Sequence, residues 1–228
     1  MSGTYAVERL RQVISSSLFL ASHLYRRRAD GDFQYDGDRP AEGWHGHGYF
    51  PKWLWVLAHG RLRRVRIWKH RWRLRHDGAT RHSRPPDDLA GLGFCTLVVA
   101  LKLWAWLDGD RGVHQSRQAL GDLETRGDPR SVQRWLRRLL PHAMAIQQAV
   151  RLAVIERCEP RPVEQLFPSG LSPPDHLSRR PWRDPSGTNQ LWRALALLLG
   201  GAIELSVPTT VLLAEARGRC GTPESSQN

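Results

Sequence analysis

The chain has 228 residues, 40% of them hydrophobic, and carries a formal net charge of +12. This length allows one larger domain or two small ones. So basic a composition favours a polyanionic partner, most often nucleic acid and second an anionic membrane surface. A solvated basic face without a partner is the alternative interpretation. A membrane-spanning protein is not expected, because no segment offers roughly 18 uncharged apolar residues in a row.

The compartment expected for the chain is the cytoplasm. Its three cysteines lie far apart and match no metal-binding spacing, which suits a reducing environment. Near the N-terminus, Glu8, Arg9 and Arg11 interrupt the apolar pattern that a secretory signal needs. We therefore expect a cytoplasmic protein without a signal peptide and without a cofactor.

The first 90 residues are predicted to form one helix and a small sheet. Apolar residues recur at helical spacing from Tyr5 to Arg28, so residues 1–30 are expected to be an N-terminal helix. Residues 31–90 follow as a small antiparallel sheet, in which RVRIWKHRWRLR forms one strand and the turn lies near His59–Gly60. The alternation within that strand changes parity, which predicts a bulge near Ile67–Trp68.

The rest of the chain is predicted to be helical. A helical domain at residues 91–158 contains helices at Phe94–Leu107, Val113–Leu123, Arg130–Leu140 and His142–Cys158. A proline-rich linker is expected at 159–186, C-terminal helices at 187–216 and a disordered tail at 217–228. The expected fold class is α+β and mostly helical, with a small antiparallel ribbon-like sheet (about residues 33–80) followed by a helix-turn-helix bundle.

Positive charge is concentrated in the second strand of this sheet. Eight Lys or Arg residues lie between Arg61 and Arg75, with Trp68 and Trp72 among them. Such a segment suits contacts with phosphate groups, which set register and salt dependence rather than sequence preference. The residues predicted to make these contacts are Arg61, Arg63, Arg64, Arg66, Lys69, Arg71, Arg73 and Arg75.

A helix-turn-helix is predicted at Leu123–Leu140. Asp128 suits an N-cap and Pro129 suits the first helical position, and the helix that follows has one apolar and one cationic face. The second helix of such a motif enters the DNA major groove and presents side chains to base edges. An ordinary amphipathic helix with a solvated basic face is the alternative. The residues predicted to contact DNA from this helix are Arg130, Gln133, Arg134, Arg137 and Arg138.

Six of the ten histidines lie between His45 and His82. His45 and His47 form an H-x-H pair, but the remaining spacings match no zinc motif. Histidines beside phosphate-binding arginines are the alternative explanation. We therefore expect no metal site.

Two glycine-containing knuckles and a downstream helix give the chain a family resemblance. The segments YDGDRPAEGWHGHGYF and RVRIWKHRWRLRHDGATRHSRPP, followed by SVQRWLRRL, resemble the N-terminal zinc ribbon and helix-turn-helix of bacterial insertion-sequence transposases and their associated orphan proteins. The resemblance covers roughly Phe33 to Leu140. It implies a DNA-binding protein associated with a mobile element, and a transposase encoded nearby as a partner. The positions that match the zinc ligands of that family are Phe33, Asp36, Leu74 and Asp77, so the resemblance implies a ribbon that has lost its zinc.

No catalytic constellation is complete in the sequence. Metal-dependent transposase catalysis needs three carboxylates gathered on a sheet, and the carboxylates after residue 140 are scattered along predicted helix and linker. The sequence therefore predicts a DNA-binding protein that is not an enzyme. Three alternatives stay open: a truncated transposase, a membrane-surface or partner-binding protein that uses the apolar Leu191–Leu205 helix, and an RNA-binding protein in which Trp68 and Trp72 stack on bases.

Overall fold

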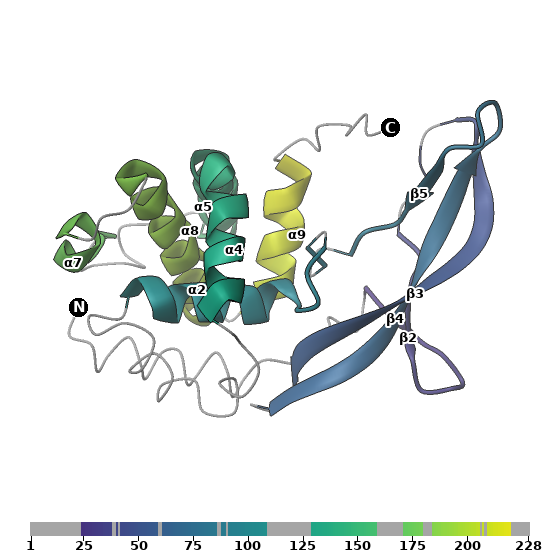
Figure 1. Cartoon of the computed structure of the whole chain (residues 1–228), viewed down its shortest axis with the longest axis horizontal. Helices are drawn as coiled ribbons and strands as arrows, with labels where there is room; N and C mark the ends of the chain where they lie inside the picture. Colours follow the sequence, from purple (N-terminus) through teal and green to yellow (C-terminus); the bar gives the residue numbers. More distant parts are fainter. Residues whose placement is uncertain are drawn as a thin grey trace.

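The computed structural model places a twisted β-sheet at one end of the molecule and a bundle of helices at the other (Figure 1). The two parts share one apolar core, in which Leu54 and Ile67 of the sheet belong to the same cluster as Val98 and Leu101 of a helix. The residues that the structure describes are 24–37, 40, 42–58, 61–85, 88–89, 91–108, 129–158, 171–179, 184–205, 207 and 209–219.

The sheet is a mixed one. Its strands are β1 (Arg26–Arg27), β2 (Phe33–Tyr35), β3 (Trp44–Ala58), β4 (Arg61–Leu74) and β5 (Thr80–His82). The strand order is β1-β2-β4-β3, and β5 pairs with β4 further along that strand. β2 runs parallel to β4, whereas the other three pairings are antiparallel.

The long β3–β4 hairpin is the main feature of the sheet (Figure 1). Its register runs from Trp44 opposite Leu74 to Ala58 opposite Arg61. This pairing agrees with the turn predicted at residues 59 and 60, which themselves lie outside the described part of the chain. The hairpin forms because β-branched and aromatic residues fill both strands and pack across the ladder.

The bulge predicted near Ile67–Trp68 is wrong. The register shift lies in the other strand, between Gly46 and Tyr49. Gly48, inside this shift, has a φ of 83°, a left-handed conformation that glycine adopts without steric cost. β4 therefore keeps an unbroken alternation, and each of its two faces can be read directly from residue parity.

The closed end of the hairpin is anchored in the core. Leu54, Val56 and Leu57 are fully buried. The segment Gly93–Cys95, which directly precedes the first helix of the bundle, covers the free edge of β3. There the Trp55 N–H donates to the Gly93 carbonyl at 2.8 Å, and the Cys95 N–H donates to the Trp55 carbonyl at 2.8 Å. The other end of the hairpin extends away from the bundle (Figure 1).

Helices make up about half of the described residues. They are α2 (Thr96–Asp108), α4 (Pro129–Leu139), the 3₁₀ helix η2 (Leu140–His142), α5 (Ala143–Cys158), α7 (Asp175–Arg179), α8 (Pro185–Glu204) and α9 (Thr209–Arg219). α8 packs against α5, α9 and α2, and Trp192 of α8 stacks on Trp104 of α2 with ring centroids 5.0 Å apart. Asp184 caps α8 by accepting a hydrogen bond from the Gly187 N–H at 2.8 Å.

The apolar run in α8 is core packing. Leu191, Trp192 and residues 194–201 are buried, so the feature that suggested a membrane-surface helix has another explanation. In the part of the chain that the structure describes, no helix combines the length and hydropathy of a membrane span.

The expected balance of the fold is wrong. A mostly helical protein with a small antiparallel ribbon was predicted, but the sheet is mixed and five-stranded, and two of its strands have 15 and 14 residues. The N-terminal helix cannot extend to residue 30, because Arg26 and Arg27 form β1. β2 depends on pairing with distant residues of β4, which local sequence patterns do not report.

The helices are closer to expectation than the sheet. The helices predicted at Phe94–Leu107, Arg130–Leu140 and His142–Cys158 correspond to α2, α4 and α5. α4 buries an apolar stripe, whereas α2 is buried on almost every side. The segment predicted as a proline-rich linker, 159–186, contains the short helix α7, which buries Leu177 in the common core. The segment Val113–Leu123 lies outside the described residues, as do residues 1–23 and 220–228.

A buried charge cluster joins the sheet to the segment that leads into the bundle. Asp88 is 3% exposed, and its carboxylate accepts hydrogen bonds from Lys52 of β3 and from Lys69 of β4, the latter at 2.8 Å. Asp88 also forms a β-bridge with Cys95, directly before α2. One carboxylate thus ties both strands of the hairpin to the start of the bundle.

Replacing Asp88 by Asn should lower the free energy of unfolding by about 3–5 kcal/mol, because removing one partner leaves buried charge uncompensated. Urea denaturation of the variant and of the wild type measures this. The control is Glu42→Gln, which removes one negative charge from an exposed position and should cost less than about 0.5 kcal/mol. A D88N variant as stable as the control would contradict the role of this cluster.

Candidate nucleic-acid interface

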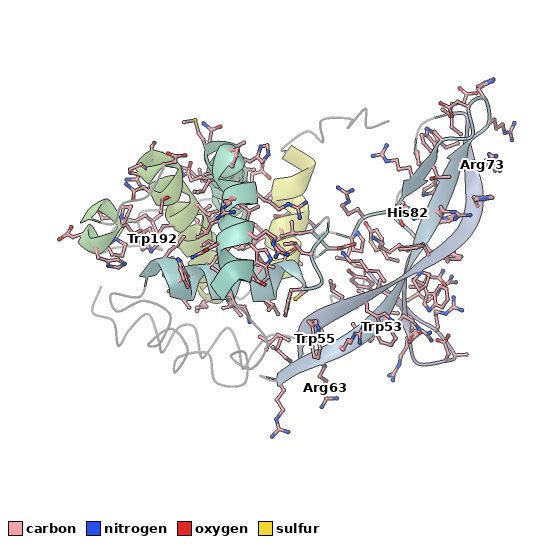
Figure 2. The ribbon with its side chains drawn as sticks, viewed as in Figure 1. Trp53, Trp55, Arg63, Arg73, His82 and Trp192 are labelled. Atoms are coloured by element: carbon pink, nitrogen blue, oxygen red, sulfur yellow. The ribbon has the colours of Figure 1, made fainter. Side chains whose placement is uncertain are left out.

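One face of the hairpin carries exposed aromatic rings among arginines. Residues of β4 with even numbers share this face, and the register adds Trp53, which lies opposite Arg66. We call the set formed by Trp53, Arg64, Arg66, Trp68 and the neighbouring Arg28 the stacking face. Figure 2 shows Trp53 on the outer part of the ribbon, away from the helices.

Trp53 is the most exposed aromatic ring of the hairpin, at 49%. The Arg64 guanidinium carbon lies 4.7 Å from its ring centroid and that of Arg66 lies 5.6 Å from it. Guanidinium groups at this distance are attracted by the electron-rich face of an indole ring, by about 0.5–1 kcal/mol at exposed sites. The ring and the two cations therefore form an ordered, solvent-accessible layer.

Trp68 is held in place by a carboxylate and by two further arginine contacts. Its indole N–H donates to Asp32 Oδ2 at 2.8 Å, and Arg66 Nε donates to the same oxygen. The guanidinium carbons of Arg28 and Arg66 lie 4.9 and 5.3 Å from the Trp68 ring. The hydrogen bond from Trp68, followed by that from Arg66, holds the pKa of Asp32 below its ordinary value of 3.8, although partial burial opposes this.

A second network continues the same face toward the far end of the hairpin. Gln34 Nε2 donates to Asp36 Oδ1 at 2.6 Å and to the Tyr49 hydroxyl at 2.8 Å, and that hydroxyl donates to Asp36 Oδ1 at 2.8 Å. Burial raises the pKa of Asp36, but these hydrogen bonds together lower it below its ordinary value. Burial and the Asp36 carboxylate raise the pKa of Tyr49. The Tyr49 ring, 39% exposed, stacks on His70 with centroids 5.0 Å apart.

Trp72 does not belong to the exposed layer. Its ring is 8% exposed and packs on His70 at 3.9 Å. The expectation that Trp72 stacks on bases is therefore wrong, because the ring is buried against His70. Trp68 keeps a partly exposed ring.

The eight predicted phosphate-contacting cations divide between the two faces of β4. Arg64 and Arg66 lie on the stacking face. Lys69 lies on the reverse face, where it is 9% exposed and paired with Asp88, so its charge is already neutralised. Arg75 follows the end of β4 in an exposed turn. The remaining members, all on the reverse face, are Arg61, Arg63, Arg71 and Arg73.

The basic face predicted for α4 is exposed. Val132, Trp135 and Leu136 are buried, and Trp135 contacts Phe94 with ring centroids 5.5 Å apart. This leaves Gln133, Arg134, Arg137 and Arg138 toward solvent. The Arg138 guanidinium lies against Gly91, where an added Cβ would come within 3.0 Å of its Nη1. The side chain of Arg130 and the expected first helix of the motif lie outside the described residues.

The four positions that match lost zinc ligands are spread along the sheet. Phe33 lies opposite Ile67 in β2, whereas Leu74 is the last residue of β4. Asp36 bonds to Gln34 and Tyr49 instead of turning toward Asp77. Among the described residues, no group of three His, Cys, Asp or Glu side chains is placed to hold a metal ion.

Sequence patterns missed the partners that order this face. Trp53 lies in β3, whereas Arg28 and Asp32 lie in the turn between β1 and β2, and only the observed register brings the two segments together. The signal in the sequence was the parity shared by Trp68 and Arg66. It identifies a face of β4 but not the residues that lie across it.

Comparison of the chain with protein-family models, with curated sequences and with solved structures gives no match in any of the three.

Replacing Trp68 by Phe should raise the pKa of Asp32 toward 3.8, because the variant loses the hydrogen bond that contributes most to lowering it. A carboxyl with a lowered folded-state pKa adds stability above its unfolded pKa, and that stability is lost as pH falls through the folded value. The W68F variant should therefore be less stable than the wild type at pH 7, and the difference should shrink at acidic pH below the wild-type pKa of Asp32. An NMR titration of the Asp32 carboxyl carbon measures the shift directly.

Trp53→Phe is the matched control, because the Trp53 indole makes no hydrogen bond to Asp32. An unchanged Asp32 titration in W68F would show that Arg66 and Arg28 lower the pKa without the indole N–H.

Proposed function

We propose that the protein binds nucleic acid through the stacking face, and that it takes up unpaired nucleotides there. The observation that carries this proposal is the half-exposed Trp53 ring, flanked by Arg64 and Arg66 at 4.7 and 5.6 Å. Single-stranded DNA and RNA are bound by aromatic rings and guanidinium planes on which bases stack, next to cations that track the backbone.

The electrostatics of the face support a polyanion. Arg66 and Arg28 have carboxylate partners, Asp32 and Asp30. Within the described part of the chain, Arg64 forms no ion pair with a carboxylate, and it is exposed. Arg64 is therefore available to a phosphate group beside a base that stacks on Trp53.

Trp53→Ala should weaken binding to a labelled single-stranded oligonucleotide by about 1–3 kcal/mol, which is roughly 5- to 150-fold, because one stacked base loses its ring. Fluorescence anisotropy with the full chain measures the affinity. Phe50→Ala is the matched control, since Phe50 is a similarly exposed ring (46%) on the opposite face, and with an oligonucleotide that carries no terminal phosphate it should bind as the wild type does.

Arg64→Gln should reduce the slope of log affinity against log salt by about 0.7, the value for one phosphate contact on a single strand. Arg134→Gln on α4 removes the same charge elsewhere and should leave the slope unchanged. Competition by duplex DNA as strong as by the single strand, together with an unaffected W53A variant, would sink the proposal.

A second candidate function is duplex DNA binding by α4, and the exposed row Gln133, Arg134 and Arg137 favours it. In that case Arg134→Gln and Arg137→Gln would relax sequence preference on duplex DNA, while Arg64→Gln would weaken all sequences equally. The association with a mobile element and with a transposase encoded nearby rests on the family resemblance and stays a proposal. Co-purification with that transposase tests it.

A further inference from the structure

The reverse face of the hairpin carries a separate group of cations near its far end. Arg71 and Arg73 are two residues apart in β4 and so point to the same side. The register places His45 of β3 opposite Arg73 and His82 of β5 opposite Arg71. Figure 2 shows Arg73 and His82 on the half of the hairpin beyond Trp53.

His47 completes the group. Its ring lies 6.5 Å from that of His45, and the positive charges of Arg71 and Arg73 help to lower its pKa. We call these five residues the reverse-face cluster: His45, His47, Arg71, Arg73 and His82.

Three nitrogen atoms of the cluster are buried without a hydrogen-bond partner. They are His45 Nδ1, Arg71 Nε and His82 Nδ1. A buried polar atom left unpaired is costly, and native proteins keep few of them. The Arg71 nitrogen can only donate, and a protonated imidazole can only donate as well, so what each of the three lacks is an acceptor such as an oxygen atom.

The cluster also lacks negative charge. In the described ranges no carboxylate forms an ion pair with Arg71, Arg73 or the three histidines. The nearest buried carboxylate on this face, Asp88, is already bound to Lys52 and Lys69. The partner that would balance this charge is therefore not among the described residues.

We propose that the reverse-face cluster binds a phosphate monoester, whose dianion is held by the guanidinium groups of Arg71 and Arg73 and accepts hydrogen bonds from the imidazole rings. A guanidinium fork matches two phosphate oxygens, and the remaining oxygen faces the histidines. Phe50, whose ring lies 4.9 Å from that of His82, provides an apolar wall for the organic part of the ester. This site lies opposite the stacking face and does not depend on it.

Binding is coupled to proton uptake. Burial, followed by the charges of Arg71, Arg73 and His45, lowers the pKa of His47. Burial and the charges of Lys69, Arg71 and Arg84 lower that of His82. A bound dianion favours the protonated rings, so affinity rises as pH falls from 8 until the phosphate itself gains a proton near pH 6.

Two sources supply this chemistry: a free phosphate monoester and the terminal phosphate of a nucleic-acid strand. The probes are inorganic phosphate and a pair of deoxythymidine oligonucleotides that differ only in a 5′-phosphate or a 5′-hydroxyl. Titrating each into the full chain, with the imidazole signals followed by NMR, reports binding without any variant. We expect the imidazole signals of His45 and His82 to shift when phosphate is added. An equal concentration of chloride should leave them unchanged.

A preference for the 5′-phosphorylated strand identifies the strand end as the source. Equal binding of both strands, with phosphate still shifting the rings, identifies a free ester. Arg71→Gln and His82→Gln should each weaken phosphate binding fivefold or more. Arg81 is the neighbour of His82 in the sequence, but it is exposed on the other face of the sheet. Arg81→Gln should therefore leave phosphate binding unchanged.

Rings that do not respond to phosphate would overturn the proposal. So would a loss in R81Q equal to that in R71Q, because general electrostatic attraction would then explain the binding. His45→Gln provides a second variant if the Arg71 substitution disturbs the sheet.

Discussion

The β3–β4 ladder is the constraint on which the other features depend. It runs from Trp44–Leu74 to Ala58–Arg61, and the side chains of β4 alternate between its two faces over that whole length. At the closed end, Leu54 and Val56 are drawn into the common core. The far end carries polar and charged residues instead, so the same ladder continues beyond the core as a surface with two chemically different faces.

Asp88 determines how this ladder meets the bundle. Its carboxylate accepts hydrogen bonds from one lysine of each strand, and its backbone forms a β-bridge with Cys95, directly before α2. Because buried like charges repel strongly in a medium of low polarity, the two lysines can lie side by side only if Asp88 stays between them. The orientation of the hairpin relative to the helices thus depends on an electrostatic contact as well as on apolar packing.

Local patterns in the sequence located α2, α4 and α5, because helices depend on neighbouring residues. They failed where pairing is distant. β2 has three residues and finds its partner in β4, 34 positions away at Phe33 and Ile67. The misplaced bulge has a similar cause: Ile67 and Trp72 are both buried, one on each face, and this resembles a change of parity when only one strand is considered.

The concentration of cations in β4 was evident from composition, but their roles were not. Lys69 is neutralised by Asp88 and Arg66 is shared with Asp32, whereas Arg64 lies over Trp53 and Arg71 has an unpaired Nε. A count of eight charges therefore overstates the surface open to a polyanion. What remains is an aromatic layer suited to bases on one face and an imidazole–guanidinium group suited to a phosphate on the other, and parity along a single strand separates the two.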